Sequence, residues 1–130
     1  MKEAKISIEQ ATSRLLQVLT RHVGEEKAVD AGTLYAEVYG ERVKNKINQT
    51  RAMRTLITAL RNKGVPIGST SAQTGGGYYL CRAGSELSAF CDRLTRRALT
   101  TLSMVAKVKK MSMPELLGQM KLNMSHRDEG

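Results

Sequence analysis

Residues 49–80 constrain the fold more strongly than any other part of the chain. Within residues 49–63, apolar side chains recur at the spacing of one helix face: Met53, Leu56, Ile57 and Leu60. Gly64 follows as a typical helix stop. Two strand-like runs come next, 65–67 and 78–80, joined by a polar loop that ends in three glycines. This order predicts an amphipathic helix followed at once by a β-hairpin.

Two helices are predicted before this stretch. A capping-box pattern, Ser-x-x-Gln, opens an amphipathic helix over residues 7–23. A shorter helix is expected over residues 33–39, ended by Gly40. The loop between these helices contains residues 28–29, which suit a very short strand.

A long helix is predicted after the hairpin. It begins at Ser85 and reaches about Lys110, and a final short helix begins at Ser112 with a proline in its first turn. After Gly118 we expect a loosely held tail. The predicted fold class is mainly α with a small β-hairpin (α+β). We expect three segments: residues 1–82 as one domain, 83–111 as the long helix, and 112–130 as a short helix with a flexible tail.

The net charge of +9 is concentrated in two blocks of the sequence. Residues 41–64 carry seven basic side chains and one acidic one, and residues 92–110 carry six basic and one acidic. A surface of this kind attracts polyanions, because each neutralised phosphate releases condensed counterions. The same charges also suit a merely solvated face, so composition leaves both interpretations open.

The reactive residue types are too scattered to form a catalytic or metal site. Cys81 and Cys91 make no C-x-x-C pair, and His22 and His126 lie far apart in the sequence. We therefore expect no enzyme activity, no metal and no cofactor. No apolar run approaches the ~20 residues that span a bilayer, and the polar N-terminus is unlike a signal peptide. The expected compartment is the cytoplasm.

The helix and hairpin carry motifs that resemble a DNA-binding family. These motifs are QTRAM (49–53) and LRNKGV (60–65) in the helix, and GYYL (77–80) in the hairpin. They are similar to the DNA-binding domain of the biotin operon repressor and its relatives, over roughly residues 8–82. The resemblance implies a winged helix-turn-helix, in which the third helix enters the major groove and the hairpin, the wing, lies over the DNA backbone.

The resemblance also implies which side chains face DNA. On the third helix these are Gln49, Thr50, Arg51, Arg54, Thr55 and Thr58, and on the wing they are Ser69, Thr70 and Gln73. We expect Arg51 and Arg54 to contact bases, because arginine pairs in bidentate fashion with guanine. Arg61 lies on the same face of the third helix as a further DNA-binding candidate, and three lysines should attract phosphates: Lys44, Lys46 and Lys63.

Two features depart from that family. The connector at residues 41–48 is longer than the family's tight turn, and nothing that resembles the ligase domain follows, so biotin chemistry is not implied. The chain as a whole also resembles small phage and prophage proteins that end in a Pro-x-Leu-x-Gly-Gln segment, here residues 114–119.

The long helix carries an apolar stripe that a small domain cannot cover completely. The stripe consists of Leu87, Phe90, Leu94, Ala98, Leu102 and Val105. A second copy of the chain would bury it in a two-fold dimer, and we favour this interpretation because such proteins read paired half-sites. The alternative is that the helix folds back over the first helix.

The tail contains a short pattern similar to the peptide by which bacterial replication proteins dock on the sliding clamp. Gln119 would hydrogen-bond the clamp, and Leu122 and Met124 would fill an apolar pocket. The alternative is an amphipathic end that packs its methionines on the domain.

Taken together, these patterns predict a sequence-specific protein that binds double-stranded DNA as a homodimer, a transcriptional regulator of phage type. The alternative is a replication-associated adaptor that docks on a partner protein through its tail.

Overall fold

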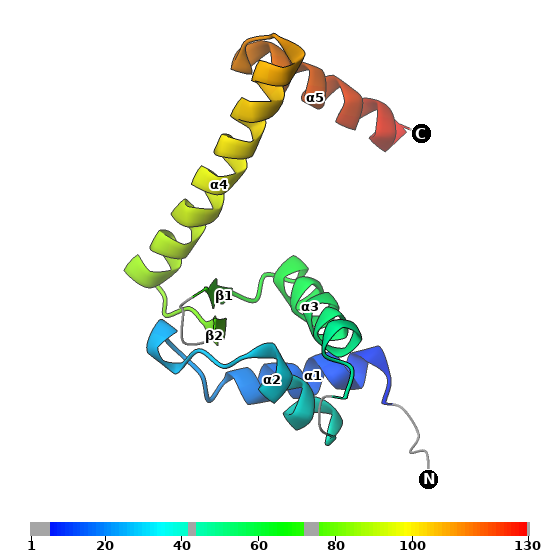
Figure 1. Cartoon of the computed structure of the whole chain (residues 1–130), viewed down its shortest axis with the longest axis vertical. Helices are drawn as coiled ribbons and strands as arrows, with labels where there is room; N and C mark the ends of the chain where they lie inside the picture. The colour runs from blue at the N-terminus through cyan, green and yellow to red at the C-terminus, as the bar shows by residue number, and fades with distance from the viewer. Residues whose placement is uncertain (1–5, 42–43, 72–75, 130) are drawn as a thin grey trace. The chain divides into compact units, whose positions relative to one another are not determined.

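The computed structural model describes residues 6–41, 44–71 and 76–129, and Figure 1 shows the course of the chain. The elements follow in the order α1 (Ile8–Leu19), η1 (Glu25–Lys27), α2 (Ala31–Tyr39), α3 (Lys46–Asn62), β1 (Ile67–Thr70), β2 (Gly77–Leu80), α4 (Ser85–Lys109) and α5 (Met113–Glu129). The predicted fold class is confirmed: the chain is mainly helical, with one small hairpin and a long helix after it.

Local signals set the start of α1 and both ends of α2, although α1 ends at Leu19 instead of residue 23 and α2 begins at Ala31 instead of residue 33. Ser7 and Gln10 close the predicted capping box, since each side chain accepts a hydrogen bond from the other residue's backbone N–H. Asp30 caps α2 by accepting from the N–H of Thr33 at 3.0 Å. Gly40 ends α2 in the left-handed conformation, as expected.

Helices α1, α2 and α3 pack on one another around a single apolar core. Each contributes the inward face that its apolar spacing predicts, and the most deeply buried members include Leu15, Leu34, Met53 and Ile57. This core fixes the orientation of α3, because one of its two faces is entirely buried.

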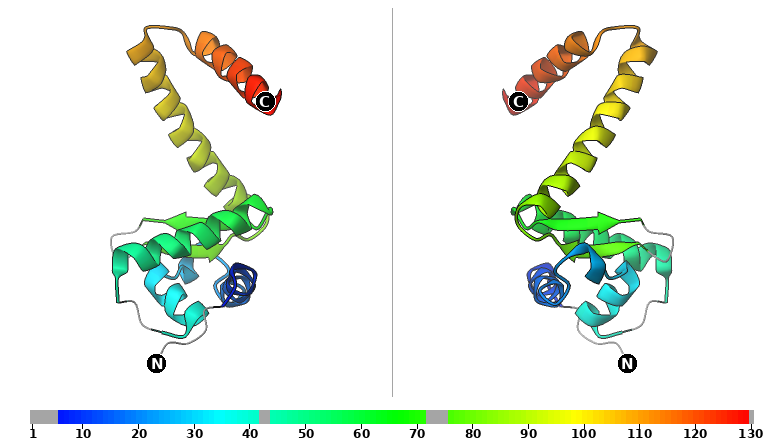
Figure 2. Two further views of the ribbon diagram at one scale, coloured as in Figure 1. Left: turned by 90° about the vertical axis from the view of Figure 1, so that its right-hand side faces the viewer. Right: turned by 90° about the vertical axis from the view of Figure 1, so that its left-hand side faces the viewer.

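The hairpin pairs Ile67 with Leu80 and Thr70 with Gly77 in an antiparallel ladder. The first strand was expected over residues 65–67 but lies further along the chain, because Val65 helps to end α3: its N–H donates to the carbonyl of Leu60 at 3.0 Å. Figure 2 shows the two strands side by side next to α3.

A third short segment pairs with the free edge of β2. The N–H of Val29 donates to the carbonyl of Tyr78 at 2.9 Å, and the N–H of Tyr78 returns a bond of 2.8 Å. The segment predicted as a very short strand thus forms a single antiparallel β-bridge with β2. Gly77 permits the close approach, because a Cβ atom there would lie 2.6 Å from the backbone carbonyl carbon and oxygen of Val29.

The start of α4 belongs to the same compact unit as the hairpin. Phe90 is 6% exposed and clusters with buried Tyr79 and Cys81, and Leu87 packs against this cluster. One compact unit therefore ends at Phe90 and a second begins at Cys91, so the boundary lies beyond the expected one at residue 82.

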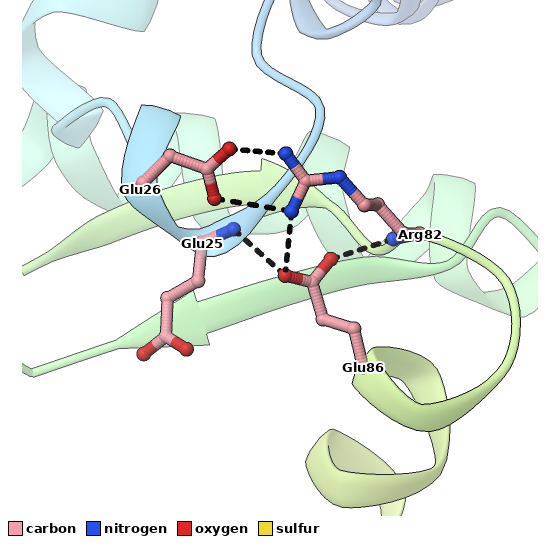
Figure 3. Close-up of polar contacts among 4 residues, drawn as sticks. All are labelled: Glu25, Glu26, Arg82 and Glu86. Atoms are coloured by element: carbon pink, nitrogen blue, oxygen red, sulfur yellow. Dashed lines mark hydrogen bonds and ion pairs between the residues drawn. The ribbon is translucent and has the colours of Figure 1, made fainter.

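Arg82 ties the first turn of α4 to η1 through a network of charged groups (Figure 3). Its guanidinium forms an ion pair with Glu26 and lies 3.5 Å from Glu86. Glu86 also accepts hydrogen bonds from the backbone N–H groups of Arg82 and Glu25, at 2.6 and 3.0 Å. Gly24 leaves room for the guanidinium, since a Cβ atom there would lie 2.5 Å from it.

A tight turn joins α4 to α5. The N–H groups of Lys110 and Met111 donate to the carbonyls of Lys107 and Ala106, which is the hydrogen-bond pattern of a Schellman motif. Lys110 takes the left-handed conformation (φ 58°) that usually belongs to glycine.

Ser112 then caps α5, because its hydroxyl and the Glu115 carboxylate each accept from the other residue's backbone N–H. These hydrogen bonds, chiefly the one from the N–H of Ser112, lower the pKa of Glu115. Helix α5 runs through Gly118 to Glu129, so the expected loosely held tail is helical instead.

Candidate nucleic-acid interface

Helix α3 presents two chemically opposite faces. Its inner face is formed by Met53, Leu56, Ile57 and Leu60, all of them buried in the core, as the sequence predicts. Its outer face carries Arg51, Arg54, Thr55 and Thr58, all of them exposed. Because the core holds the inner face, the outer face is presented on a rigid element.

The outer face is positively charged and rich in hydrogen-bonding groups. No acidic residue occurs between Lys44 and Lys63 in the sequence. Among the ion pairs of the described residues, none involves Arg51 or Arg54. The Thr55 hydroxyl donates to the carbonyl of Arg51 at 3.2 Å, so its proton is engaged while its oxygen keeps two lone pairs that can accept hydrogen bonds.

Two residues of this face were not among the sequence-based candidates. Ile47, which is 68% exposed, and Asn62 share the outer side with the two arginines, at helical spacing. Ile47 was missed because the helix was expected to begin at residue 49, whereas it begins at Lys46. An exposed apolar group beside arginines is suited to contact a thymine methyl group.

Gln49 has a structural role that the sequence analysis did not predict. Its side-chain oxygen accepts from the backbone N–H groups of Lys44 and Asn45, while the Asn45 side chain accepts from the N–H of Asn48. The Gln49 side chain, which was expected to face DNA, is thus engaged at the N-terminus of α3, where backbone donors lack helical partners. Thr50 is half-buried, and its hydroxyl donates to Ile47 at 3.3 Å.

Arg61 also departs from its expected place on the DNA-facing surface. It is half-buried, its Nε–H donates to the carbonyl of Ile67 at 2.9 Å, and its guanidinium lies 5.6 Å from the centre of the Phe90 ring. Arg61 therefore connects α3 to β1 and to the first turns of α4 instead of pointing outward.

The remaining DNA-binding candidates fall into three groups. Lys44 and Lys63, at the two ends of α3, are exposed, whereas Ser69 and Thr70 on β1 are half-buried. The backbone of Lys46 begins α3, but its side chain lies outside the described part of the chain, and Gln73 lies outside it entirely.

The structure divides the six expected dimerisation residues. Leu87 and Phe90 pack in the core of the first unit, so they are not available to a second copy. Leu94 and Ala98 are exposed, and Leu102 and Val105 are half-buried.

The expected clamp-docking residues lie within α5 instead of an extended tail. Gln119 and Leu122 share one side of the helix, but Met124 lies about 160° from Leu122 around the axis at 100° per residue. Leu122 and Met124 are both exposed. They cannot fill one pocket together unless this part of α5 unwinds.

Comparisons with known proteins do not assign the chain to a family: no family model, curated protein or solved structure matches it. Within the described residues, no group of three or more metal-ligating side chains comes together. The helices of the described regions also include none with the length and apolar character needed to cross a membrane.

Proposed function

We propose that the first unit is a winged-helix domain that binds double-stranded DNA in a sequence-specific manner, and that the protein acts as a dimeric transcriptional regulator of phage type. The observation that carries this proposal is the outer face of α3, where Arg51, Arg54 and Thr58 stand exposed on a helix whose opposite face is buried. Such a helix fits the major groove, about 12 Å wide, with its side chains toward the base edges.

The surroundings of α3 support the same function. Lys44 and Lys63 are placed to attract phosphates at its two ends, and the hairpin beside it has the position of a wing. The wing residues Ser69 and Thr70 lie on β1, which leads toward the hairpin tip. Contacts of this kind set the position on the backbone, whereas Arg51 and Arg54 would set the sequence preference.

The experiment is selection of bound duplexes from a random-sequence pool, with the full chain at near-physiological salt. We expect a palindromic motif, because a two-fold dimer reads two equivalent half-sites. A soluble, folded protein that enriches no motif would contradict sequence-specific binding. That result would favour the alternative function, in which the protein docks on a replication protein through α5.

Two variants distinguish base contacts from phosphate contacts. We expect Arg54→Ala to weaken binding to the selected site by roughly 5- to 150-fold, the equivalent of about 1–3 kcal/mol, with little effect on unrelated DNA. Lys63→Ala should weaken both kinds of DNA about equally and reduce the salt dependence by about one phosphate contact. Equal losses on both DNAs for the two variants would contradict these roles.

A further inference from the structure

Helix α4 carries a heptad repeat that differs from the stripe expected from the sequence. Apolar or small residues alternate at steps of three and four: Cys91, Leu94, Ala98, Thr101, Val105 and Val108. We call this set the α4 seam. Its mean period of 3.5 residues is that of the a and d positions of a left-handed coiled coil, with Cys91, Ala98 and Val105 at a. None of its members is charged.

Within the described part of the second unit, the α4 seam is mostly exposed, and Val105 is its one half-buried member. Every residue from 91 to 101 is exposed, and Val108 is 76% exposed. The buried side chains of residues 91–124 are Ala106 and Leu116, at the turn between the two helices. Helices in proteins depend mainly on packing of an apolar face, so a seam of this length indicates a missing partner helix.

We propose that the α4 seam pairs, in parallel and in register, with the same seam of a second copy. The inference deepens the dimeric part of the proposed function and does not depend on DNA binding. Val105 at a and Leu94 at d are the residue types that favour two parallel strands at these positions, whereas the other four seam positions do not match this pattern. The Thr101 hydroxyl already donates to the carbonyl of Arg97 at 3.0 Å, so its burial leaves no unmet donor.

The area of the α4 seam, together with its flanking residues, approaches that of a small specific dimer interface. Burying a side chain of this size removes roughly 60–120 Å² from water, so the seams of two copies remove about 700–1,400 Å². Leu102 and Met104 flank the seam and add to this area. A specific interface begins at about 1,200 Å² in total. Parallel pairing also places both first units at the same end of the paired helices, as paired half-sites require.

The first test is the oligomeric state of the full chain by sedimentation equilibrium without DNA. We expect a dimer, and we expect Leu94→Lys to raise its dissociation constant at least about 100-fold, because two buried leucines are lost and two charges face each other. Leu99→Lys is the matched control. Leu99 lies on another side of the same helix at similar exposure, 48% against 41% for Leu94. Circular dichroism checks that both variants keep their helices.

The second test uses Cys91 as a reporter of strand direction. In a parallel dimer the two Cys91 thiols face each other, and copper-phenanthroline with dissolved oxygen should join them; each disulfide releases two protons and two electrons, which oxygen takes up. An antiparallel pair centred on the seam would place Cys91 opposite Val108, with the two cysteines about 25 Å apart. A disulfide requires Cα atoms within about 7 Å.

The cross-link has its own matched control. A variant with Cys91→Ser and Leu99→Cys carries its exposed thiol outside the seam and should not cross-link. Cys81 is buried, so it should not cross-link in either the parent or the variant. A monomeric parent chain, or equal effects of Leu94→Lys and Leu99→Lys, would overturn the proposal. A dimer that fails to cross-link through Cys91 would overturn the parallel register. A dimer that passes both tests but does not bind DNA would contradict the proposed DNA-binding function and leave the pairing of the α4 seams unaffected.

Discussion

Replacing Arg61 with alanine should lower the stability of the first unit and leave the exposed face of α3 in place. Arg61 connects three elements, since it donates to the carbonyl of Ile67 on β1 and lies over the Phe90 ring of α4. Arg54, two turns earlier on the same helix, is exposed. The pair therefore tests whether two arginines of one basic helix have different roles.

The size of the effect follows from the contacts of Arg61. A hydrogen bond from a charged donor contributes about 1.5–3 kcal/mol, and a cation–π contact contributes about 0.5–2 kcal/mol. Among the described residues, the buried Nη2 atom of Arg61 has no hydrogen-bond partner, and removing this unmet donor returns about 1–3 kcal/mol. The net loss of unfolding free energy should be about 1–3 kcal/mol. Arg61→Met should lose less, because it keeps the side-chain stem without the charge.

Urea unfolding followed by tyrosine fluorescence is the appropriate assay. All four tyrosines lie in the first unit, at residues 35, 39, 78 and 79, and the chain has no tryptophan, so the signal reports this unit alone. We expect Arg61→Ala to lower the midpoint by roughly 0.5–1.5 M, at a typical slope of about 2 kcal/mol per molar urea. Arg54→Ala should leave it unchanged. An unchanged midpoint for Arg61→Ala, with a weakened cognate site, would refute the structural role.

Three further predictions concern backbone and charge. Gly77→Ala should destabilise the first unit by about 1–3 kcal/mol in the same assay, since its Cβ would meet the backbone of Val29; wild-type stability would contradict this close approach. The ion pair with Arg82 lowers the pKa of Glu26, so the stability it adds is present above the ordinary value of 4.5 and is lost as the pH falls through the lowered value. Glu26→Gln should therefore be less stable than the parent protein at neutral pH and equally stable in acid. A stability difference that persists at low pH would argue against the ion pair. Lys110→Gly should raise the thermal midpoint of the second unit, followed by circular dichroism, because glycine adopts φ 58° without strain; a lower midpoint would show that the turn is unstrained.

Many element boundaries could be predicted from the sequence because their causes are local. The capping box at Ser7 and the glycine stops at Gly40 and Gly64 act within one turn of the chain, and each is found as expected. The inner face of α3 was also predictable, because apolar residues at helical spacing must turn toward a core. Both kinds of signal require no knowledge of distant residues.

The candidate site was only partly predictable. Arg51, Arg54, Thr55 and Thr58 are exposed on one face, as their spacing suggested. Gln49 and Arg61 have the same polar character, yet one caps the helix and the other contacts β1 and Phe90. Periodicity assigns a residue to a face, but it cannot identify a partner that arrives from another element.

The sequence by itself determined several helix ends, the apolar face of α3, and the gathering of charge on this segment. These properties depend on neighbours within a few positions, where helix geometry leaves little choice. Only the tertiary structure decided that Leu87 and Phe90 join the core of the first unit, and that Val29 forms a β-bridge with Tyr78 of the hairpin. The two partners of each such contact are far apart in the sequence. Which residues become partners depends on side-chain volume and backbone hydrogen bonding within the formed core.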